Sequence, residues 1–398
     1  MPASYPVLRL RKGKERSVKN KHPWIFSGAL HPEPSGVKDG DLVTVITEDG
    51  ETIATGFFHK STITVRCLAF EKVEIDAGFW QDKFQSAWHY RKTIGLVNNS
   101  ATNAFRLIHG EGDGLPGLVI DYYDGICVLQ LYTAGMYAQR DSIVNALQSV
   151  QGMPIKAIFD KSGETLSRYR PEGGNDGFIY RQKEPLPEYV LENNIRFRVD
   201  YEGGQKTGFF LDQRDNRSLV KQYAAGKKVL NTFSYTGGFS LYALAAGASL
   251  VHSVDSSKRA IEGIEANIEL NDFSTHLHQG FAMDVMTFLK SGTEQYDLII
   301  LDPPAYAKHL SQAKQAMIGY RNLNTEGIRK IQPGGILFTF SCSQVIDREL
   351  FRKIIFQSAL QAGRNVRIMH QLSQPPDHPV NIYHPEAEYL KGLVVYVE

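Results

Sequence analysis

Alternating apolar and polar residues near the amino terminus predict a small β-domain. Strands are expected at residues 41–46 and 62–68, and in the second of these the two residue types alternate. The dipeptides Asp39-Gly40 and Asp49-Gly50 are turn signals of the kind that separate short strands. We therefore predict a β-barrel of about 70 residues in this part of the chain.

A helical spacing follows this region and marks a second domain. Between residues 79 and 97, Trp80, Phe84 and Trp88 recur at four-residue intervals, which is typical of an amphipathic helix. The chain from residue 105 to 187 then mixes strands with another helix, and we predict a central α+β domain. The expected strands are residues 117–121, 126–132 and 155–160, and the expected helix is residues 137–148.

Strands and helices alternate in the carboxyl-terminal part. The expected strands are residues 228–231, 251–255, 296–301 and 336–340, and the expected helices are residues 239–246, 258–271 and 351–360. This order is typical of a doubly wound α/β fold with a mostly parallel sheet. Residues 393–397 follow a Pro-containing connection and are expected to form an antiparallel edge strand. The predicted domains are residues 1–74, 75–187 and 188–398.

Composition agrees with three globular domains, and charge is informative only locally. The chain has 398 residues, of which 42% are hydrophobic and 22% are charged. Because 44 Lys and Arg residues are balanced by 43 Asp and Glu residues, a nucleic-acid footprint has to be a local patch. The most basic stretch runs from Arg9 to Lys21, with seven basic residues and the single acid Glu15, and an aromatic run at residues 22–26 follows it.

Three cysteines, Cys67, Cys127 and Cys342, are too few and too scattered for a disulfide framework or a structural zinc site. We predict no metal site, and a reducing cytoplasm as the location. The amino terminus has no apolar run of signal-peptide length, and no stretch is long enough to predict a membrane span. The sequence does not give an oligomeric state, and a homodimer stays open.

A glycine-containing turn after the first strand of the α/β domain predicts a nucleoside site. Ligands of such folds bind at the carboxyl ends of the strands, and the glycines let the backbone approach them closely. Asp255 ends the next strand, where a carboxylate can accept both hydroxyls of a ribose, and Asp284 follows the third. The turn lacks the dinucleotide spacing, so we predict a cofactor without pyrophosphate, namely S-adenosylmethionine. The alternatives are an ordinary tight turn and two helix caps. The predicted cofactor contacts in the turn are Asn231, Phe233, Tyr235, Thr236 and Gly237.

Two further strands end in residues with catalytic chemistry. Asp302 follows an apolar strand and precedes two prolines, which places a carboxylate at the edge where the cofactor is expected. Cys342 follows the next strand and lies beside Asp302 if the two strands are neighbours. A thiol there is a candidate nucleophile when its neighbours lower its pKa. Cys67 and Cys127 lie within strands and are expected to be buried core residues.

These motifs together resemble the bacterial large-subunit ribosomal RNA cytosine-5 methyltransferases that carry an amino-terminal PUA domain. The resemblance covers almost the whole chain and depends on the blocks HPWIFSGAL, FRLIHGEGDGLPGLVIDYY, QKTGFFLDQRDNR, NTFSYTGGF, DPPAY and FSCS. It implies a PUA-like barrel, the central α+β domain and a Rossmann-like class I methyltransferase domain. It also implies that Cys342 is the nucleophile, that Gln213 and its neighbours contact the methionine part of the cofactor, and that Asp255 and Asp284 contact its ribose and adenine.

The resemblance also implies a mechanism. Cys342 adds to C6 of a cytosine, Asp302 assists at the N3 edge, and C5 receives the methyl group. Related enzymes with two cysteines have one where this chain has Pro304, so a one-cysteine mechanism is implied, with no base assigned for the C5 proton. Large-subunit ribosomal RNA is the expected partner. The residues expected to hold its phosphates are Arg9, Arg11, Lys12, Lys14 and Arg16, unless they form only a solvated basic face.

Three rival functions stay open at this point. Methylation of an exocyclic amine or a ring nitrogen would use Asp302 without Cys342, although Ala305 in DPPAY departs from the D-P-P-Y motif of many amino-group methyltransferases. A uridine C5 enzyme would use the same cysteine chemistry. A ribosome-assembly protein would bind RNA without turnover.

Overall fold

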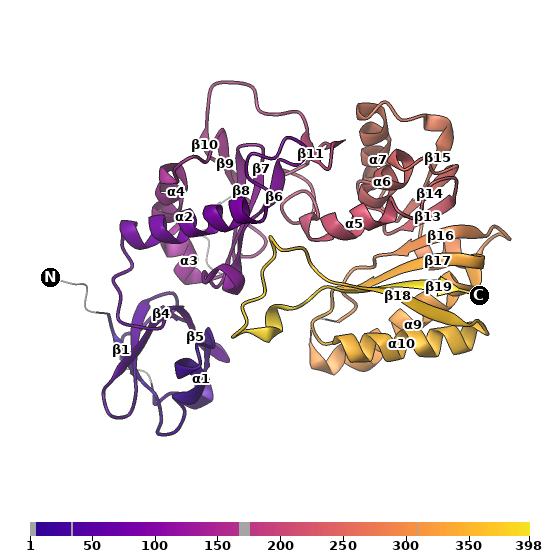
Figure 1. The fold of residues 1–398 in the computed structure, drawn as a ribbon. Helices are drawn as coiled ribbons and strands as arrows, with labels where there is room; N and C mark the ends of the chain where they lie inside the picture. Colours follow the sequence, from indigo (N-terminus) through magenta and orange to yellow (C-terminus); the bar gives the residue numbers. More distant parts are fainter. Residues whose placement is uncertain (1–4, 33–34, 167–175, 308) are drawn as a thin grey trace. The chain divides into compact units, whose positions relative to one another are not determined.

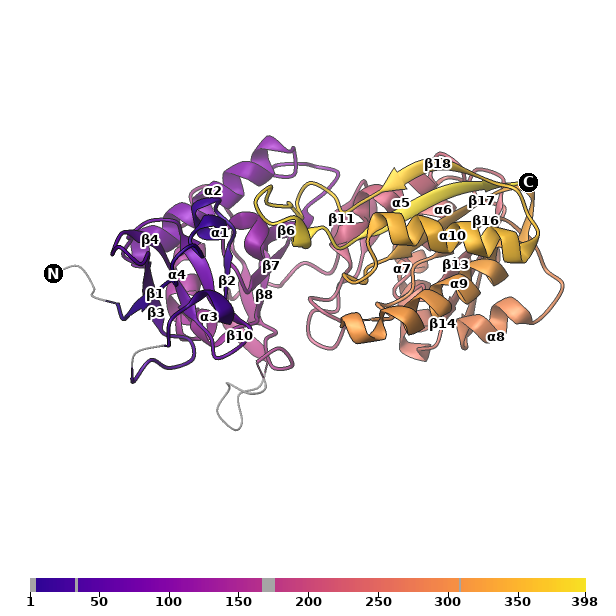
Figure 2. The same cartoon turned by 90° about the horizontal axis from the view of Figure 1, so that it is seen from below.

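The computed structural model describes residues 5–32, 35–166, 176–307 and 309–398. The chain forms two compact units, each of which contains segments that are distant in sequence (Figures 1 and 2). The first unit contains residues 1–190, 199–211 and 376–387. The second contains residues 191–198, 212–375 and 388–398.

A five-stranded sheet forms the amino-terminal part of the first unit. Its strands are β1 (Val7–Arg9), β2 (Trp24–Phe26), β3 (Leu42–Ile46), β4 (Thr52–Phe58) and β5 (Ile63–Ala69), with α1 (Arg16–Lys19) between the first two. The strand order is β1-β3-β4-β5-β2, and only the pair β1 and β3 is parallel. Val43, Val45 and Val65 belong to its core and are fully buried. The strands predicted at residues 41–46 and 62–68 are confirmed as β3 and β5.

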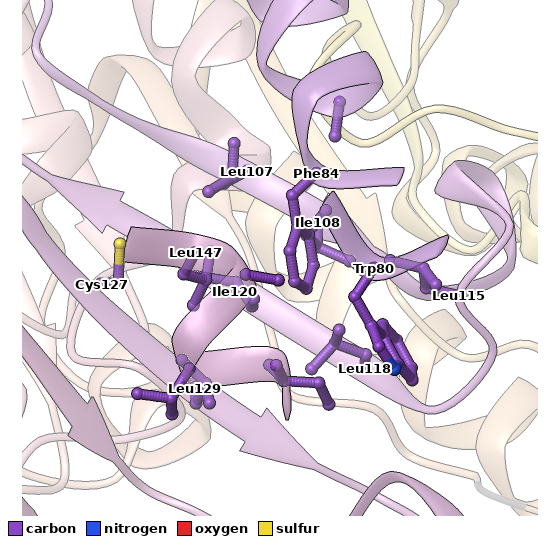
Figure 3. Packing of buried hydrophobic residues seen from close by; sticks show 14 of the residues in the cluster. Trp80, Phe84, Leu107, Ile108, Leu115, Leu118, Ile120, Cys127, Leu129 and Leu147 are labelled. Atoms are coloured by element: carbon purple, nitrogen blue, oxygen red, sulfur yellow. The ribbon is translucent and has the colours of Figure 1, made fainter. Parts of the chain in front are cut away.

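The central part of the first unit is a second five-stranded sheet covered by helices. Its strands are β6 (Ala104–His109), β7 (Leu118–Tyr123), β8 (Ile126–Leu131), β9 (Ala157–Asp160) and β10 (Gly177–Arg181), in the order β10-β9-β8-β7-β6. Its helices are α2 (Ala77–Thr93), α3 (Ala134–Ala138) and α4 (Arg140–Ser149). Figure 3 shows Trp80 and Phe84 of α2 packed against strand residues such as Leu107 and Ile120. The three predicted strands of this region are confirmed as β7, β8 and β9.

The helix predicted at residues 137–148 is two helices. Gln139 ends α3 and also stands at the N-cap of α4, with ψ of 6° in place of the helical value. Thr133 starts α3 through its side chain, which accepts a hydrogen bond from the backbone nitrogen of Met136 at 3.2 Å. This capping signal was not recognised in the sequence.

The second unit is a seven-stranded sheet with helices on both faces. Its strands are β13 (Lys228–Thr232), β14 (Leu250–Asp255), β15 (His278–Ala282), β16 (Tyr296–Leu301), β17 (Ile331–Ser341), β18 (Val366–Leu372) and β19 (Lys391–Val397). Its helices are α5 (Arg214–Val220), α6 (Gly238–Ala245), α7 (Lys258–Leu270), α8 (Val285–Lys290), α9 (Ala313–Lys330) and α10 (Arg348–Ala362). Two further strands, β11 (Val190–Glu192) and β12 (Ile195–Phe197), precede this region in the sequence and form a separate two-stranded sheet.

The strand order of the large sheet is β15-β14-β13-β16-β17-β19-β18, and its first five strands are parallel. Figure 1 shows α5, α6 and α7 on one side of these strands and α9 and α10 on the other. The order reverses between β13 and β16, and ligands of such sheets bind at the carboxyl ends beside the reversal. The predicted mostly parallel, doubly wound α/β fold is confirmed.

The prediction that residues 393–397 form an edge strand is wrong. These residues lie in β19, which is antiparallel but pairs with β17 on one side and with β18 on the other. The edge strand β18 was missed because Arg367, Ile368 and Met369 are all exposed. A strand without a buried face gives no alternation of apolar and polar residues in the sequence.

Among the residues that the structure describes, no helix has the length and apolar character needed to cross a membrane.

Candidate cofactor and catalytic site

The turn between β13 and α6 has an unusual backbone. Phe233, Tyr235 and Gly237 have φ angles of 53°, 45° and 84°, in the left-handed region that most residues avoid. At Gly237 a Cβ atom would lie 2.9 Å from the side chain of Ile264, so both its φ angle and its packing require glycine. Such conformations cost free energy and are concentrated at ligand sites. The turn predicted from the glycines therefore has the backbone expected of a binding loop.

Buried polar atoms without partners line the same turn. Asn231 Oδ1, Ser234 Oγ and Thr236 Oγ1 are buried, and none has a hydrogen-bond partner among the described residues. The amide nitrogen of Asn231 is used, because it donates to Ser240 Oγ at 2.8 Å. Buried polar groups in folded proteins are nearly always hydrogen-bonded. Three such atoms in one turn fit a polar ligand, such as the nucleoside and amino-acid parts of S-adenosylmethionine.

Asp255 and Asp284 follow the two strands next to the turn. Asp255 accepts hydrogen bonds from the backbone nitrogens of Tyr235 and Ser257, both at 2.9 Å. It is therefore fixed at the carboxyl end of β14, beside the binding turn. Asp284 is exposed and caps α8, and hydrogen bonds from Thr287 hold the pKa of its carboxyl below the ordinary value. The ribose and adenine contacts of these two residues stay predictions.

Asp302 follows β16 and lies in a group with two residues that precede α5. The side chain of Gln213 forms a hydrogen bond with Asp302, whereas Asp212 is a nearby like charge. Loss of water around Asp302, followed by the effect of Asp212, raises the pKa of the Asp302 carboxyl to about 7. Asp212 accepts a hydrogen bond from the hydroxyl of Tyr389 at 2.7 Å, and its other carboxylate oxygen is buried without a partner among the described residues. Gln213 thus lies beside Asp302, and its contact with the cofactor stays a prediction.

Cys342 lies beside Asp302, as predicted for neighbouring strands. β16 and β17 are paired, and Leu301 is in register with Thr339. The half-buried thiol of Cys342 points to the carbonyl oxygen of Pro303 at 4.0 Å. Burial, and then the charges of Asp302 and Asp212, raise the pKa of this thiol to about 12. The neighbours thus raise the pKa of Cys342 in the free protein, and the cation of Lys391, followed by a backbone hydrogen bond, opposes this shift.

The other two cysteines are core residues, as expected. Cys67 and Cys127 are 2% and 0% exposed, and burial raises the pKa of each thiol to about 12. Cys342 is therefore the most accessible cysteine of the chain.

The basic stretch lies on and beside β1 in the first unit. Arg9 donates to the backbone oxygens of Thr47 and Glu48, at 3.3 and 2.6 Å, which fixes its guanidinium against the sheet. The other predicted phosphate-binding residues, Arg11, Lys12, Lys14 and Arg16, are all exposed. The five side chains thus provide positive charge at the surface of this sheet.

Exposed aromatic rings accompany this charge. Phe26 and Tyr383 are 45% and 47% exposed, and Lys21 Nζ lies 5.7 Å from the centre of the Tyr383 ring. Such rings can stack on the bases of single-stranded RNA. Tyr383 was not recognised in the sequence, because it comes from residues 376–387, which join the first unit from a distant part of the chain.

One group of residues in the first unit also has the donor atoms that metals take. His22, His384 and Glu386 bring three such atoms within 4.8 Å of one another. His22 Nε2 lies 3.5 Å from the Glu386 carboxylate, and the ring of His384 packs at 4.3 Å between centroids on Trp24. Both ring nitrogens of His384 are buried without a hydrogen-bond partner among the described residues.

Sequence reasoning missed several residues of the catalytic end of the sheet. Asp212 belongs to the LDQR block, and its place beside Gln213 was the available signal. Lys391 is the first residue of β19 and Tyr389 lies two residues before it, and a lysine at the start of an apolar strand was a weaker signal. The sequence around Tyr389 and Lys391 has no pattern that indicates proximity to Asp302 or Cys342. The fold of the sheet brings these two residues to the site from the far end of the chain.

Comparisons with known proteins show the family of this chain. The model of the S-adenosylmethionine-dependent methyltransferase family matches residues 105–395, and that of the PUA-like domain matches residues 8–70. Ribosomal RNA large subunit methyltransferase I of Klebsiella pneumoniae is 37% identical over 398 residues, which are 99% of this chain and 98% of that protein. The protein of the same name from Aeromonas hydrophila is 39% identical and covers 98% of each chain.

Solved structures give the same result. An S-adenosylmethionine-dependent methyltransferase from Streptococcus mutans has a TM-score of 0.84 at 26% identity, and the match covers 98% of this chain and 100% of that one. A methyltransferase structure complexed with SAH has a TM-score of 0.85, with the same identity and coverage. The chain therefore belongs to the S-adenosylmethionine-dependent methyltransferase family, with a PUA-like domain at its amino-terminal end and S-adenosylmethionine as its cofactor.

Proposed function

We propose that this protein methylates C5 of a cytosine in large-subunit ribosomal RNA and that Cys342 is its nucleophile. The observation that carries the proposal is the position of Cys342 and Asp302 at the ends of two paired strands, beside the binding turn. The full-length relatives named ribosomal RNA large subunit methyltransferase I support the choice of substrate.

The protonation of Asp302 supports cytosine as the target base. With a pKa of about 7, a substantial fraction of this carboxyl carries a proton at neutral pH. A protonated carboxyl donates a hydrogen bond, and N3 of cytosine is an acceptor. N3 of uridine carries a proton and is a donor, so it would need the ionised form instead. The raised pKa of Asp302 thus favours cytosine over uridine.

The side chains of the binding turn would hold the cofactor. Asn231, Ser234 and Thr236 offer buried polar atoms, and Asp255 offers a carboxylate fixed by two backbone nitrogens. S-adenosylmethionine supplies the methyl group when it is bound there. The chemistry of the target base is then left to Cys342 and Asp302.

The reaction begins when the Cys342 thiolate adds to C6 and forms an S–C6 bond. Asp302 gives its proton to N3, which neutralises the charge that the addition places on the ring. C5 becomes electron-rich and receives the methyl group. A base, to which no residue is assigned, then takes the C5 proton. N3 returns its proton to Asp302, and the S–C6 bond breaks to restore the thiolate and the aromatic ring.

RNA binding is assigned to the first unit. The exposed basic residues beside β1 would contact phosphates, and Phe26 and Tyr383 would stack on bases. Because a base within a duplex is inaccessible to Cys342, the target cytosine is single-stranded or flipped out when it reacts. Its RNA substrate and its free cysteines also support a cytoplasmic location for the protein.

A second candidate function is methylation of a ring nitrogen or exocyclic amine without a covalent intermediate. The observation that favours it is the thiol of Cys342, whose pKa is raised to about 12 in the free protein. In this case Asp302 would position the nitrogen, and Cys342 would be dispensable. An RNA-binding assembly protein would need neither residue.

Trapping the covalent adduct separates these functions. RNA with 5-fluorocytosine accepts the thiolate and the methyl group but cannot lose fluorine as a proton, so the S–C6 bond persists. Wild-type protein should migrate with this RNA on a denaturing gel only when S-adenosylmethionine is present. Cys342→Ala should neither crosslink nor turn over, whereas Cys67→Ala serves as the matched control and should crosslink. Normal turnover by Cys342→Ala on unmodified RNA would instead establish nitrogen methylation.

A further inference from the structure

Lys391 lies against the peptide segment that contains the proposed nucleophile. It is the first residue of β19 and pairs in register with Ser341, the residue before Cys342. Its Nζ donates to the backbone oxygen of Ser343, the residue after Cys342, at 2.8 Å. The backbone of Lys391 thus lies opposite the residue before Cys342, and its amine is bonded to the residue after Cys342.

The environment of Lys391 is unusual for a lysine. The residue is 3% exposed, and the second acceptor of Nζ is the backbone oxygen of Tyr389 at 2.6 Å. Across the part of the chain that the structure describes, no carboxylate lies within ion-pair distance of this Nζ. Buried lysines are normally paired with a carboxylate. Here both acceptors are neutral carbonyls.

Two carbonyl acceptors suit the neutral amine as well as the ammonium. An ammonium group has three hydrogens to donate, and a neutral amine has two hydrogens and one lone pair. Ser343 and Tyr389 accept two hydrogens, so Lys391 keeps both hydrogen bonds when it loses its third proton. The site therefore holds the amine in one position in either protonation state, which is the requirement for a group that receives and returns a proton.

We propose that Lys391 takes the thiol proton of Cys342 as the sulfur adds to the target base, and returns this proton when the S–C6 bond breaks. The proposal rests on the proposed function. The S–H bond breaks and an N–H bond forms, while the sulfur electron pair makes the bond to C6. At the end of the cycle the thiolate recovers the proton from the Lys391 ammonium. Lys391 thus ends each turnover as the neutral amine from which it began.

The charges around Lys391 agree with this role. Burial lowers the pKa of Lys391 to about 8, and Arg348 also lowers it, whereas Cys342, Glu388 and Asp347 raise it. A proton acceptor works best when its pKa is close to the working pH. Proton transfer from Cys342 to Lys391 is unfavourable in the free protein, because the thiol is a weaker acid than the Lys391 ammonium. It becomes favourable once the sulfur is bonded to C6 and no longer carries a charge beside Asp302 and Asp212.

Alkylation of Cys342 tests the proposal without RNA or turnover. Iodoacetamide consumes the thiolate, and mass spectrometry of the Cys342 peptide gives its rate of alkylation as a function of pH. Lys391→Met should lower this rate at pH 8 by about tenfold or more, because the proton acceptor and its charge are both lost. Lys330→Met is the matched control, since Lys330 Nζ also donates to two backbone oxygens, both at 2.7 Å, but away from Cys342. Equal alkylation in wild type and Lys391→Met would overturn the proposal.

A second variant separates the proton from the charge. Lys391→Arg keeps a cation that is not deprotonated in this pH range, so alkylation should persist while turnover on RNA falls by about a hundredfold. Wild-type turnover with an unchanged pH profile in Lys391→Arg would show that only the charge matters and would overturn proton transfer. Unchanged binding of S-adenosylmethionine by calorimetry shows that each variant is folded. The trapping experiment on wild-type protein fails if the proposed function is wrong, whereas the alkylation of Cys342 needs neither RNA nor turnover.

Discussion

The thiol of Cys342 points to the backbone oxygen of Pro303 at 4.0 Å, and this contact joins the ends of two paired strands. Each end carries one reactive group, because Asp302 precedes the proline and Cys342 follows β17. The two groups have opposite requirements. A carboxyl with a raised pKa is ready to give a proton, whereas a thiol with a raised pKa needs help to lose one.

Cofactor affinity is expected to depend on Asp255. Asp255→Asn keeps the size of the side chain but removes the charge that would bind ribose hydroxyls. Loss of one charge-assisted contact should weaken S-adenosylmethionine binding by roughly 1.5–3 kcal/mol. Calorimetry on the free protein measures this directly, with Glu262→Gln on the exposed face of α7 as the control. Equal affinities in the two variants would remove Asp255 from the cofactor site.

RNA affinity is expected to depend on the basic stretch in a salt-dependent way. Replacing Arg11, Lys12 and Lys14 by glutamine should weaken binding to every RNA, because fewer counterions are released. For single-stranded RNA the slope of log affinity against log salt should fall in magnitude by about 2. The control variant replaces three exposed lysines of the second unit, Lys258, Lys290 and Lys353. An unchanged slope would identify residues 9–21 as a solvated basic face.

The exposed rings offer an independent test of the same surface. Phe26→Ala with Tyr383→Ala should weaken binding of single-stranded RNA by about 1–3 kcal/mol for each base that stacks. The salt slope should not change, since no charge is removed. If the variant lost as much affinity for duplex RNA as for single-stranded RNA, stacking would be contradicted, because paired bases are not available to these rings.

Local patterns were sufficient for the residues that end parallel strands. Asp302 and Cys342 each follow a short apolar run, and neighbouring parallel strands bring such ends together, so their proximity was predictable. The glycine turn was predictable for a similar reason, since the left-handed φ angle of Gly237 needs this residue type.

Long-range contacts were not predictable. Asp377 accepts a hydrogen bond from the backbone nitrogen of Arg106, and its own backbone oxygen accepts one from Arg91, across 271 and 286 residues of sequence. These bonds place residues 376–387 in the first unit, although the strands before and after them belong to the second. Lys391 escaped recognition in the same way, because nothing near it in sequence indicates that it lies beside Cys342.

The buried ion pair of Glu192 and Arg217 is expected to be important for stability. The two side chains are 0% and 3% exposed and form two hydrogen bonds, at 2.7 and 2.6 Å. Glu192→Gln would leave the Arg217 charge buried and uncompensated, at a cost of about 3–5 kcal/mol. Urea unfolding measures the loss. Glu349→Gln, which breaks an exposed pair with Lys353, should cost much less, because solvent screens that pair, and equal losses would contradict the special role of the buried pair.

Asp302 is expected to make stability and activity depend on pH in a defined direction. Its pKa rises from 3.8 to about 7 in the folded protein, so the folded state binds a proton that the unfolded chain has already lost in this range. Stability from this group is therefore complete below about pH 4 and is lost as the pH rises through 7. Asp302→Asn removes this dependence on pH. The melting temperature of the wild type should therefore fall relative to that of Asp302→Asn between pH 5 and pH 8. Turnover of the wild type should fall above pH 7, because Asp302 then lacks the proton that it gives to N3. Asp302→Asn should turn over slowly at every pH but should still bind S-adenosylmethionine. A melting-temperature difference that stays constant with pH would show that Asp302 is ionised throughout, and the preference for cytosine over uridine would lose its basis.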